Sequence, residues 1–96
     1  MSAETLERPR TSGPGSGTGG NWQVIVLNDD HNTFEHVAKA ISRVIPGVSL
    51  DAGHRFADTI HSSGQAVVWT GQREPAELYW EQLKSAGLTM APLDQH

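Results

Sequence analysis

Six consecutive polar residues, from Asn28 to Thr33, form the densest group of chemically active side chains in the sequence. They comprise two carboxylates, two carboxamides, one imidazole and one hydroxyl, and so supply many hydrogen-bond acceptors. A β-branched apolar run precedes them and an amphipathic run follows, which predicts an elbow between a strand and a helix. Loops between such elements often carry binding sites, although a solvated polar turn is an equally good interpretation of the spacing alone.

The entry to the predicted helix has its own signals. Asn32 is the predicted N-cap, and Glu35 is expected at the third helical position as its capping-box partner. This pairing would fix the end of the elbow against the first turn of the helix.

His61 is the second residue that could contribute to a site. It follows apolar Ile60 in the last turn of a predicted helix, one turn beyond Ala57. Two interpretations stay open. The imidazole could favour the negative end of the helix dipole, or it could face the elbow.

Other kinds of chemistry lack a matching pattern. The five histidines show no dedicated zinc spacing, and the chain has no cysteine for a thiolate ligand or nucleophile. The serines lie in no nucleophile motif, and no glycine-rich phosphate loop follows a strand. The sequence therefore predicts no enzyme, no metal and no cofactor.

The apolar periodicity predicts three strands and three helices in one small α+β domain. We expect strands over residues 23–27, 65–70 and 88–91 and helices over 33–45, 50–63 and 75–86. Ser49 is the predicted cap of the second helix, Gly64 its C-terminal stop, and Pro75 the first residue of the third. That third helix should direct Leu78, Tyr79 and Leu83 inward. The order β-α-α-β-α-β fits a three-stranded sheet with the helices packed on one face.

Composition limits the class of protein. Residues 1–20 are rich in Gly and Ser and should form a flexible, disordered tail before a single domain over residues 21–96. The net charge of −4 argues against nucleic-acid binding. No apolar run approaches the roughly 18 residues of a membrane span, and no signal-peptide core is present. We therefore expect a cytoplasmic monomer that does not bind membranes.

Several motifs together resemble the ClpS family of adaptors for the Clp protease. They are Leu27-Asn28-Asp29-Asp30, then Phe34-Glu35 and Val37, then Ile60-His61 followed by Gly64-Gln65-Ala66-Val67. The stretch Leu83–Thr89 is also similar, so the resemblance covers about residues 22–93.

The resemblance implies a recognition protein of the N-end rule. Such adaptors bind the free α-amino group and the bulky hydrophobic first residue (Leu, Phe, Tyr or Trp) of N-degron proteins. They deliver these proteins to a Clp AAA+ unfoldase of the ClpA or ClpC type for proteolysis, and the unfoldase would engage the tail.

The resemblance also implies roles for individual residues. Asn28, Asp29 and His61 would hold the amine, with Asp29 acting directly or through water. The pocket for the first side chain would be lined by Phe34, Val37, Ala57 and Ile60 and closed near Leu93, while Asp30 and Asn32 would support the loop.

This chain departs from the family pattern in two places. Many members carry Met where Phe34 stands and a bulky residue where Ala57 stands, so the pocket should differ in shape. The stretch Trp69–Glu77 looks shortened, and unfoldase contacts cannot be transferred to it.

Two alternatives remain at this point. A non-catalytic interaction module could share the fold without binding N-degrons, as in the C-terminal domain of the ribosomal stalk protein. A small metal-dependent enzyme could instead use the elbow and the histidines.

Overall fold

The structure of the protein is a computed structural model that describes residues 22–95. The predicted tail, residues 1–20, lies outside the described residues. The elements along the chain are β1 (Trp22–Leu27), α1 (Phe34–Val44), α2 (Leu50–Ser63), β2 (Gln65–Gly71), α3 (Arg73–Ser85), β3 (Thr89–Met90) and β4 (Asp94–Gln95).

The centre of the sheet is β1, which pairs antiparallel with β2 along its whole length. On its other edge, β1 pairs with β3 near its C-terminal end and with β4 near its N-terminal end. The predicted α+β fold, with its three-stranded sheet, is confirmed, and the short β4 is an addition that the sequence did not indicate. Pro92 lies between β3 and β4 and has no backbone N–H to donate, which explains why this edge is divided.

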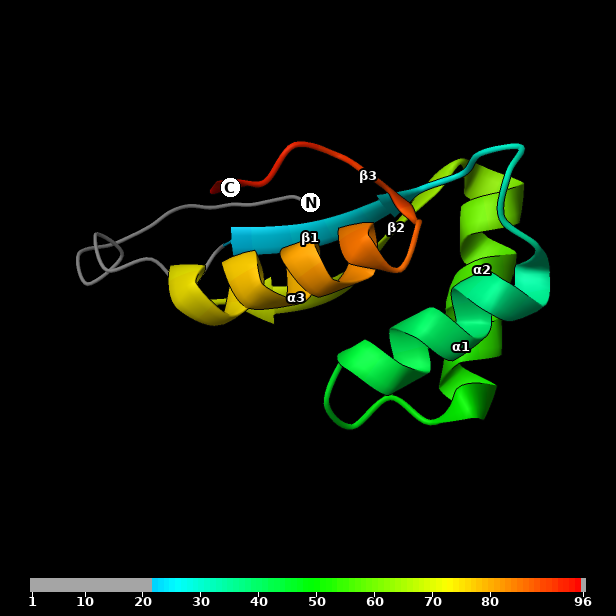
Figure 1. The fold of residues 1–96 in the computed structure, drawn as a ribbon, viewed down its shortest axis with the longest axis horizontal. Helices are drawn as coiled ribbons and strands as arrows, with labels where there is room; N and C mark the ends of the chain where they lie inside the picture. The colour runs from blue at the N-terminus through cyan, green and yellow to red at the C-terminus, as the bar shows by residue number, and fades with distance from the viewer. Residues whose placement is uncertain (1–21, 96) are drawn as a thin grey trace.

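One hydrophobic core joins the helices to the sheet. Figure 1 shows α3 lying along the sheet, with α1 and α2 as a helical pair at one end. The largest fully buried side chains are Val24 and Val26 of β1, Ile41 of α1 and Leu83 of α3. They belong to a single cluster of buried residues. None of the helices in the described range has the length and apolar character needed to cross a membrane.

The predicted ends of α2 are confirmed. The Ser49 hydroxyl accepts a hydrogen bond from the backbone N–H of Ala52 at 3.1 Å, as an N-cap should. At the other end, Gly64 adopts a left-handed conformation with φ of 92°, which a residue with a side chain rarely adopts. Both ends of α2 are therefore encoded locally.

The prediction for α3 was wrong in two respects. The helix begins at Arg73, so Pro75 occupies the third helical position; this is tolerated because N–H groups in the first turn have no helical partner. Leu78 is 52% exposed, whereas Ala76 and Leu83 face the core. Because Leu78 lies only two residues from Ala76, a helical twist of 3.6 residues per turn directs it to nearly the opposite side.

The two helices α1 and α2 approach each other very closely at Gly53. A Cβ atom at this position would overlap the backbone carbonyl group of Ala38 in α1. A glycine is therefore required here because the backbone of α1 occupies the space that a side chain would need.

We expect Gly53→Ala to lower the free energy of unfolding by about 1–3 kcal/mol, since overpacking forces the helices apart. An exposed helical site would instead gain about 1 kcal/mol from the better propensity of alanine. Urea unfolding measures the difference, and Asp58→Ala on the exposed side of the same helix is the matched control. A Gly53→Ala variant as stable as the wild type would contradict the close packing.

Candidate functional site

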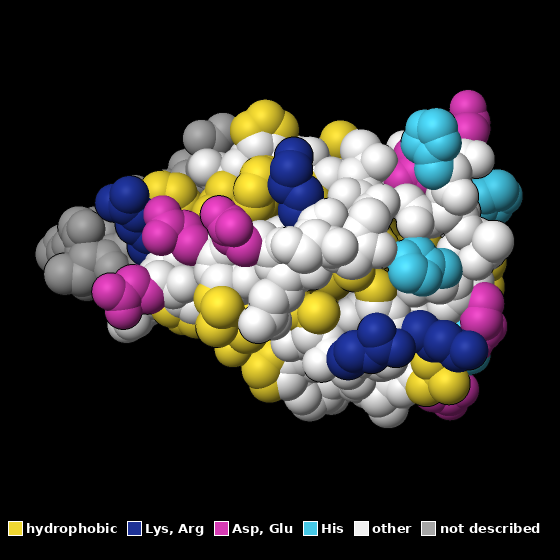
Figure 2. Space-filling view, in the orientation of Figure 1, with side chains coloured by type: hydrophobic (Ala, Val, Ile, Leu, Met, Phe, Trp, Pro, Cys, Tyr) yellow, Lys and Arg dark blue, Asp and Glu magenta, His cyan; other side chains and the backbone are white. Residues whose placement is uncertain are grey.

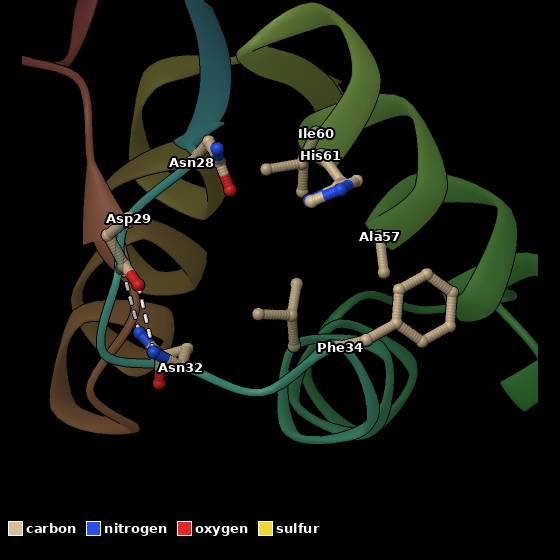
Figure 3. A pocket seen from close by; sticks show the side chains of 8 residues that line it. Asn28, Asp29, Asn32, Phe34, Ala57, Ile60 and His61 are labelled. Atoms are coloured by element: carbon tan, nitrogen blue, oxygen red, sulfur yellow. Dashed lines mark hydrogen bonds between the residues drawn. The ribbon is translucent and has the colours of Figure 1, made fainter.

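The elbow between β1 and α1 is attached to the end of α2. The backbone N–H of Asn28 donates to the carbonyl oxygen of Gly64 at 2.9 Å. Because His61 lies in the last turn of α2, this bond brings the first residue of the elbow beside the imidazole. Figure 3 shows the side chains of Asn28 and His61 directed toward the same open space.

The Asp29 carboxylate holds the elbow in shape through four hydrogen bonds. Its Oδ1 accepts from the backbone N–H groups of His31 and Asn32, both at 2.9 Å. Its Oδ2 accepts from the Asn32 side chain at 2.8 Å and from the Thr89 hydroxyl at 2.6 Å. A carboxylate has about four lone-pair positions, so these donors occupy its hydrogen-bonding capacity.

These contacts also attach the elbow to the turn between α3 and β3. The Asn32 side chain donates to the carbonyl oxygen of Gly87 at 2.9 Å, and Thr89 lies two residues further on. His36 Nε2 lies 2.8 Å from the carbonyl oxygen of Ala86 in the same turn. The polar elbow is therefore a fixed structure rather than a solvated turn.

The charge state of Asp29 follows from its surroundings. Partial burial raises its pKa, but the hydrogen bonds from Thr89, Asn32 and His31 lower it by more, and the net pKa lies well below its usual range. Asp29 therefore stays ionised and places a negative charge at one side of the elbow.

The predicted capping box was wrong. The N-cap of α1 is Thr33, whose hydroxyl accepts from the backbone N–H of His36 at 3.0 Å. Asn32 is instead engaged with Asp29 and Gly87, which removes its side chain from the helix end. Glu35 consequently lies at the second helical position, and its carboxylate contacts His54 of α2.

Elements from both halves of the chain enclose a pocket of about 270 Å³. The polar side chains lie toward the elbow and the end of α2, and the apolar ones toward the facing surfaces of α1 and α2 (Figure 3). The residues that line it are Asn28, Asp29, Asn32, Phe34, Val37, Ala57, Ile60 and His61.

The structure brings together most of the residues that were expected to form the site. Two of them lie apart from the pocket. Asp30 is exposed and is not among the residues that line the pocket, and Leu93 packs against the hydrophobic core after β3. We therefore leave Leu93 out of the pocket.

Two contributors were missed by sequence reasoning. Thr89 bonds Asp29 across 60 residues of sequence, and no local pattern indicates such a contact. His54 was not predicted to contribute to the site, but it stacks on Phe34. Its spacing to Ala57 and His61, which are three and seven residues later, could have placed it on the same helical face.

The histidine side chains visible in Figure 2 gather at the end of the molecule built by the elbow, α1 and α2. Within residues 22–95, they and the acidic side chains form no group of three that could hold a metal ion. The chemistry of the pocket is thus that of hydrogen-bond acceptors beside an apolar surface.

Comparisons with known proteins agree on one family. Residues 18–94 match the sequence model of the family described as ATP-dependent Clp protease adaptor protein ClpS. The ClpS adapter protein of Nostoc sp. is 55% identical over 74 residues, covering 77% of this chain and 76% of that protein. The ClpS adapter protein of Thermosynechococcus vestitus is 54% identical over 74 residues, covering 77% and 79% of the two chains.

A solved structure shares the fold as well. Agrobacterium tumefaciens ClpS2 bound to L-phenylalaninamide superposes with a TM-score of 0.69 and 31% sequence identity. The match covers 78% of this chain and 95% of that one.

The network around Asp29 predicts an acid-sensitive stability. Because folding lowers the pKa of Asp29, its ionised form stabilises the fold at pH values above about 4, and this contribution is lost as the pH falls toward the lowered pKa. Asp29→Asn turns one acceptor into a donor that faces other donors. We expect it to lower the free energy of unfolding by about 1–3 kcal/mol near neutral pH.

Urea unfolding of both proteins over a series of pH values measures this contribution. The difference in the free energy of unfolding between the wild type and Asp29→Asn should become smaller in acid, as the wild-type carboxylate takes up a proton. Asp30→Asn, which changes an exposed carboxylate in the same elbow, should show no such difference. A difference that is the same at every pH would contradict the role given to the Asp29 charge.

Proposed function

The chain belongs to the ClpS family of ATP-dependent Clp protease adaptors, and from this premise we propose that its pocket binds the first residue of N-degron proteins. The observation that carries the proposal is the division of one pocket into a polar end and an apolar end. The free α-amino group would occupy the polar end, and the first side chain would occupy the apolar end.

The polar end suits an α-ammonium group. This group offers three donors and no acceptor, so removing it from water requires several converging acceptors. We assign two direct contacts, to the Asn28 side-chain oxygen and to a neutral nitrogen of His61. The orientation of Asn28 and His61 supports this assignment, since both side chains point into the pocket (Figure 3).

Asp29 would contribute in a different way. Its oxygens already accept four hydrogen bonds from the protein, so we assign it no direct bond to the amine. Its negative charge still favours an ammonium group nearby, and its hydrogen bonds hold Asn32 in place. The family resemblance implies that Asp29 holds the amine directly or through water, and this assignment leaves out the direct bond.

The apolar end suits a large hydrophobic side chain. Ala57 and Ile60 are both 3% exposed and form a fixed surface on α2, while Phe34 and Val37 face them from α1. Full burial of a side chain such as Leu or Phe contributes about 1.5–3 kcal/mol. The ClpS2 relative supports the same arrangement, because L-phenylalaninamide combines a free α-amino group with an aromatic side chain.

The family indicates the partner class of the adaptor. A Clp protease adaptor works with a Clp unfoldase, and we propose a AAA+ unfoldase of the ClpA or ClpC type that receives the bound N-degron protein. In this scheme the chain contributes recognition and delivery, and the partner contributes the ATP-dependent chemistry.

Fluorescence anisotropy with labelled peptides that differ only at the first residue tests the proposal. We expect binding of peptides that begin with Leu, Phe, Tyr or Trp, because both ends of the pocket are then occupied. Acetylation of the amine should abolish measurable binding, since it removes the positive charge and two of the three N–H donors and adds an acetyl group at the polar end. Equal binding of acetylated and free peptides would contradict amine recognition.

Variants of the polar end locate the binding. Asn28→Ala and His61→Ala should each weaken binding by about tenfold to a hundredfold, the range expected for hydrogen bonds to a charged group. His31→Ala is the matched control, because it removes an exposed imidazole from the same elbow without changing the pocket lining. Unchanged affinity in both Asn28→Ala and His61→Ala would move the amine away from this site.

A further inference from the structure

One wall of the pocket is the aromatic ring of Phe34, which packs against a second ring. Phe34, at the first position of α1, lines the pocket and stacks on the His54 ring of α2. The ring centroids are 5.7 Å apart and the planes differ by 6°, as in an offset stack. The Phe34 ring therefore separates the pocket from the imidazole.

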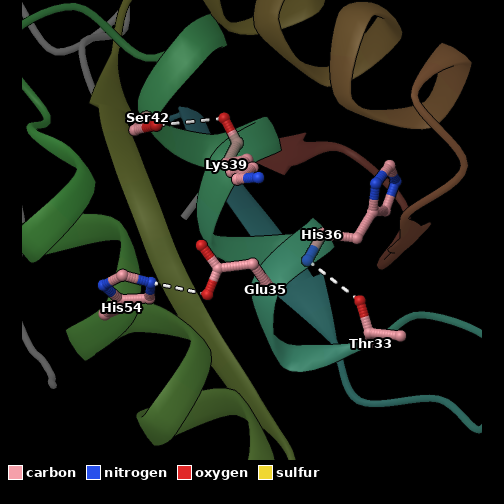
Figure 4. Close-up of polar contacts among 6 residues, drawn as sticks. All are labelled: Thr33, Glu35, His36, Lys39, Ser42 and His54. Carbon is pink, nitrogen blue, oxygen red and sulfur yellow. Dashed lines mark hydrogen bonds and ion pairs between the residues drawn. The ribbon is translucent and has the colours of Figure 1, made fainter.

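The imidazole is itself held in place by an acidic side chain. The Nε2–H of His54 donates to Oε1 of Glu35 at 3.0 Å, and Figure 4 shows this contact bridging α2 and α1. Glu35 directly follows Phe34 in the sequence. These two neighbours on α1 contact the same imidazole on α2: Phe34 stacks on the ring, and Glu35 accepts from its Nε2–H. The three side chains form what we call the Phe34 support: Phe34, Glu35 and His54.

The backbone arrangement makes this contact possible. Gly53 packs directly on the backbone of α1 at Ala38, so the residue that follows it, His54, comes within reach of the start of α1. On α2, His54 precedes Ala57 by three residues and His61 by seven, which places all three on one helical face. The same face of α2 therefore carries three residues with different roles. We assign amine binding to His61, Ala57 lines the pocket, and His54 contacts Phe34.

The support matters because Phe34 is only partly buried. The residue is 47% exposed, and the neighbouring wall residue Ala57 is small. Figure 3 shows the Phe34 ring beside Ala57 at the apolar end. A released ring could rotate about its side-chain bonds and lengthen the pocket, whereas the stacked ring limits its length.

We propose that His54 and Glu35 are positioning residues that set the size selectivity of the pocket for the first side chain. The proposal rests on the proposed function and adds to it the determinant of preference among hydrophobic first residues. A fixed Phe34 ring favours the short, branched side chain of Leu over the longer ring system of Trp. His54 acts on Phe34 by stacking, and Glu35 acts on His54 by fixing its orientation.

The test compares the affinity of the full chain for peptides that begin with Leu or Trp. We expect the ratio of the Trp-peptide Kd to the Leu-peptide Kd to fall by about two- to tenfold in His54→Ala, which matches the loss of one aromatic stack. Glu35→Ala should lower the same ratio by less. It should change nothing further in the His54→Ala background, because its effect passes through the imidazole.

A conservative variant separates positioning from general stability. His54→Phe retains a ring that can stack, so it should keep most of the wild-type ratio while losing the bond to Glu35. Arg55→Ala is the matched control on the same helix, because its exposed side chain pairs with Asp51 and neither residue lines the pocket. It should leave the ratio unchanged.

The possible failures point to different conclusions. An unchanged ratio in folded His54→Ala and Glu35→Ala, with the Leu peptide still bound, would overturn the positioning role and leave amine recognition intact. Additive effects of His54→Ala and Glu35→Ala on the ratio would overturn the proposal that Glu35 acts on Phe34 through His54. A wild-type chain that binds no peptide with a free amine would overturn the proposed function and the positioning role with it.

Discussion

The site depends first on the hydrogen bonds that converge on the Asp29 carboxylate. The elbow is polar throughout, and such a segment would otherwise exchange its hydrogen bonds with water. Four donors from the elbow and from Thr89 replace those water contacts and join two segments that lie far apart in the sequence. Ionised carboxylates form stronger hydrogen bonds than neutral acceptors, so this one group can hold the elbow against the turn after α3.

Within that frame, separate contacts position the two ends of the pocket. The polar end is positioned by the elbow and by the bond from Asn28 to Gly64. The apolar end is positioned by the close packing of α1 on α2 and by the support of Phe34. In the proposed function a ligand would occupy both ends at once, which would give specificity without any covalent chemistry. The fold alone would not distinguish an N-degron adaptor from an interaction module, but the family match and the two-ended pocket favour the adaptor.

Local sequence signals predicted the fold well, and the family resemblance indicated most of the residues that line the pocket. The element order, the caps of α2 at Ser49 and Gly64, and the polar elbow all depend on side chains acting within a few residues of their own position. The error at the start of α1 has a different origin. Asn32 was expected to cap α1 because it has the right chemistry at the right position, yet Gly87 and Asp29 compete for the same amide group. Thr33, one residue later, caps the helix instead.

The sequence by itself determined the order of the three helices and the first three strands, because backbone propensity, capping and apolar periodicity are local properties. It also determined which residues carry hydrogen-bond acceptors. Only the tertiary structure decided which of these side chains remain available. Asp29 satisfied its acceptors within the protein, His54 and Glu35 paired across two helices, and Leu93 joined the core instead of the pocket. The His54–Glu35 contact joins residues 19 positions apart, and the bond from Thr89 to Asp29 joins residues 60 positions apart. No local pattern specifies which distant partner a polar side chain will meet.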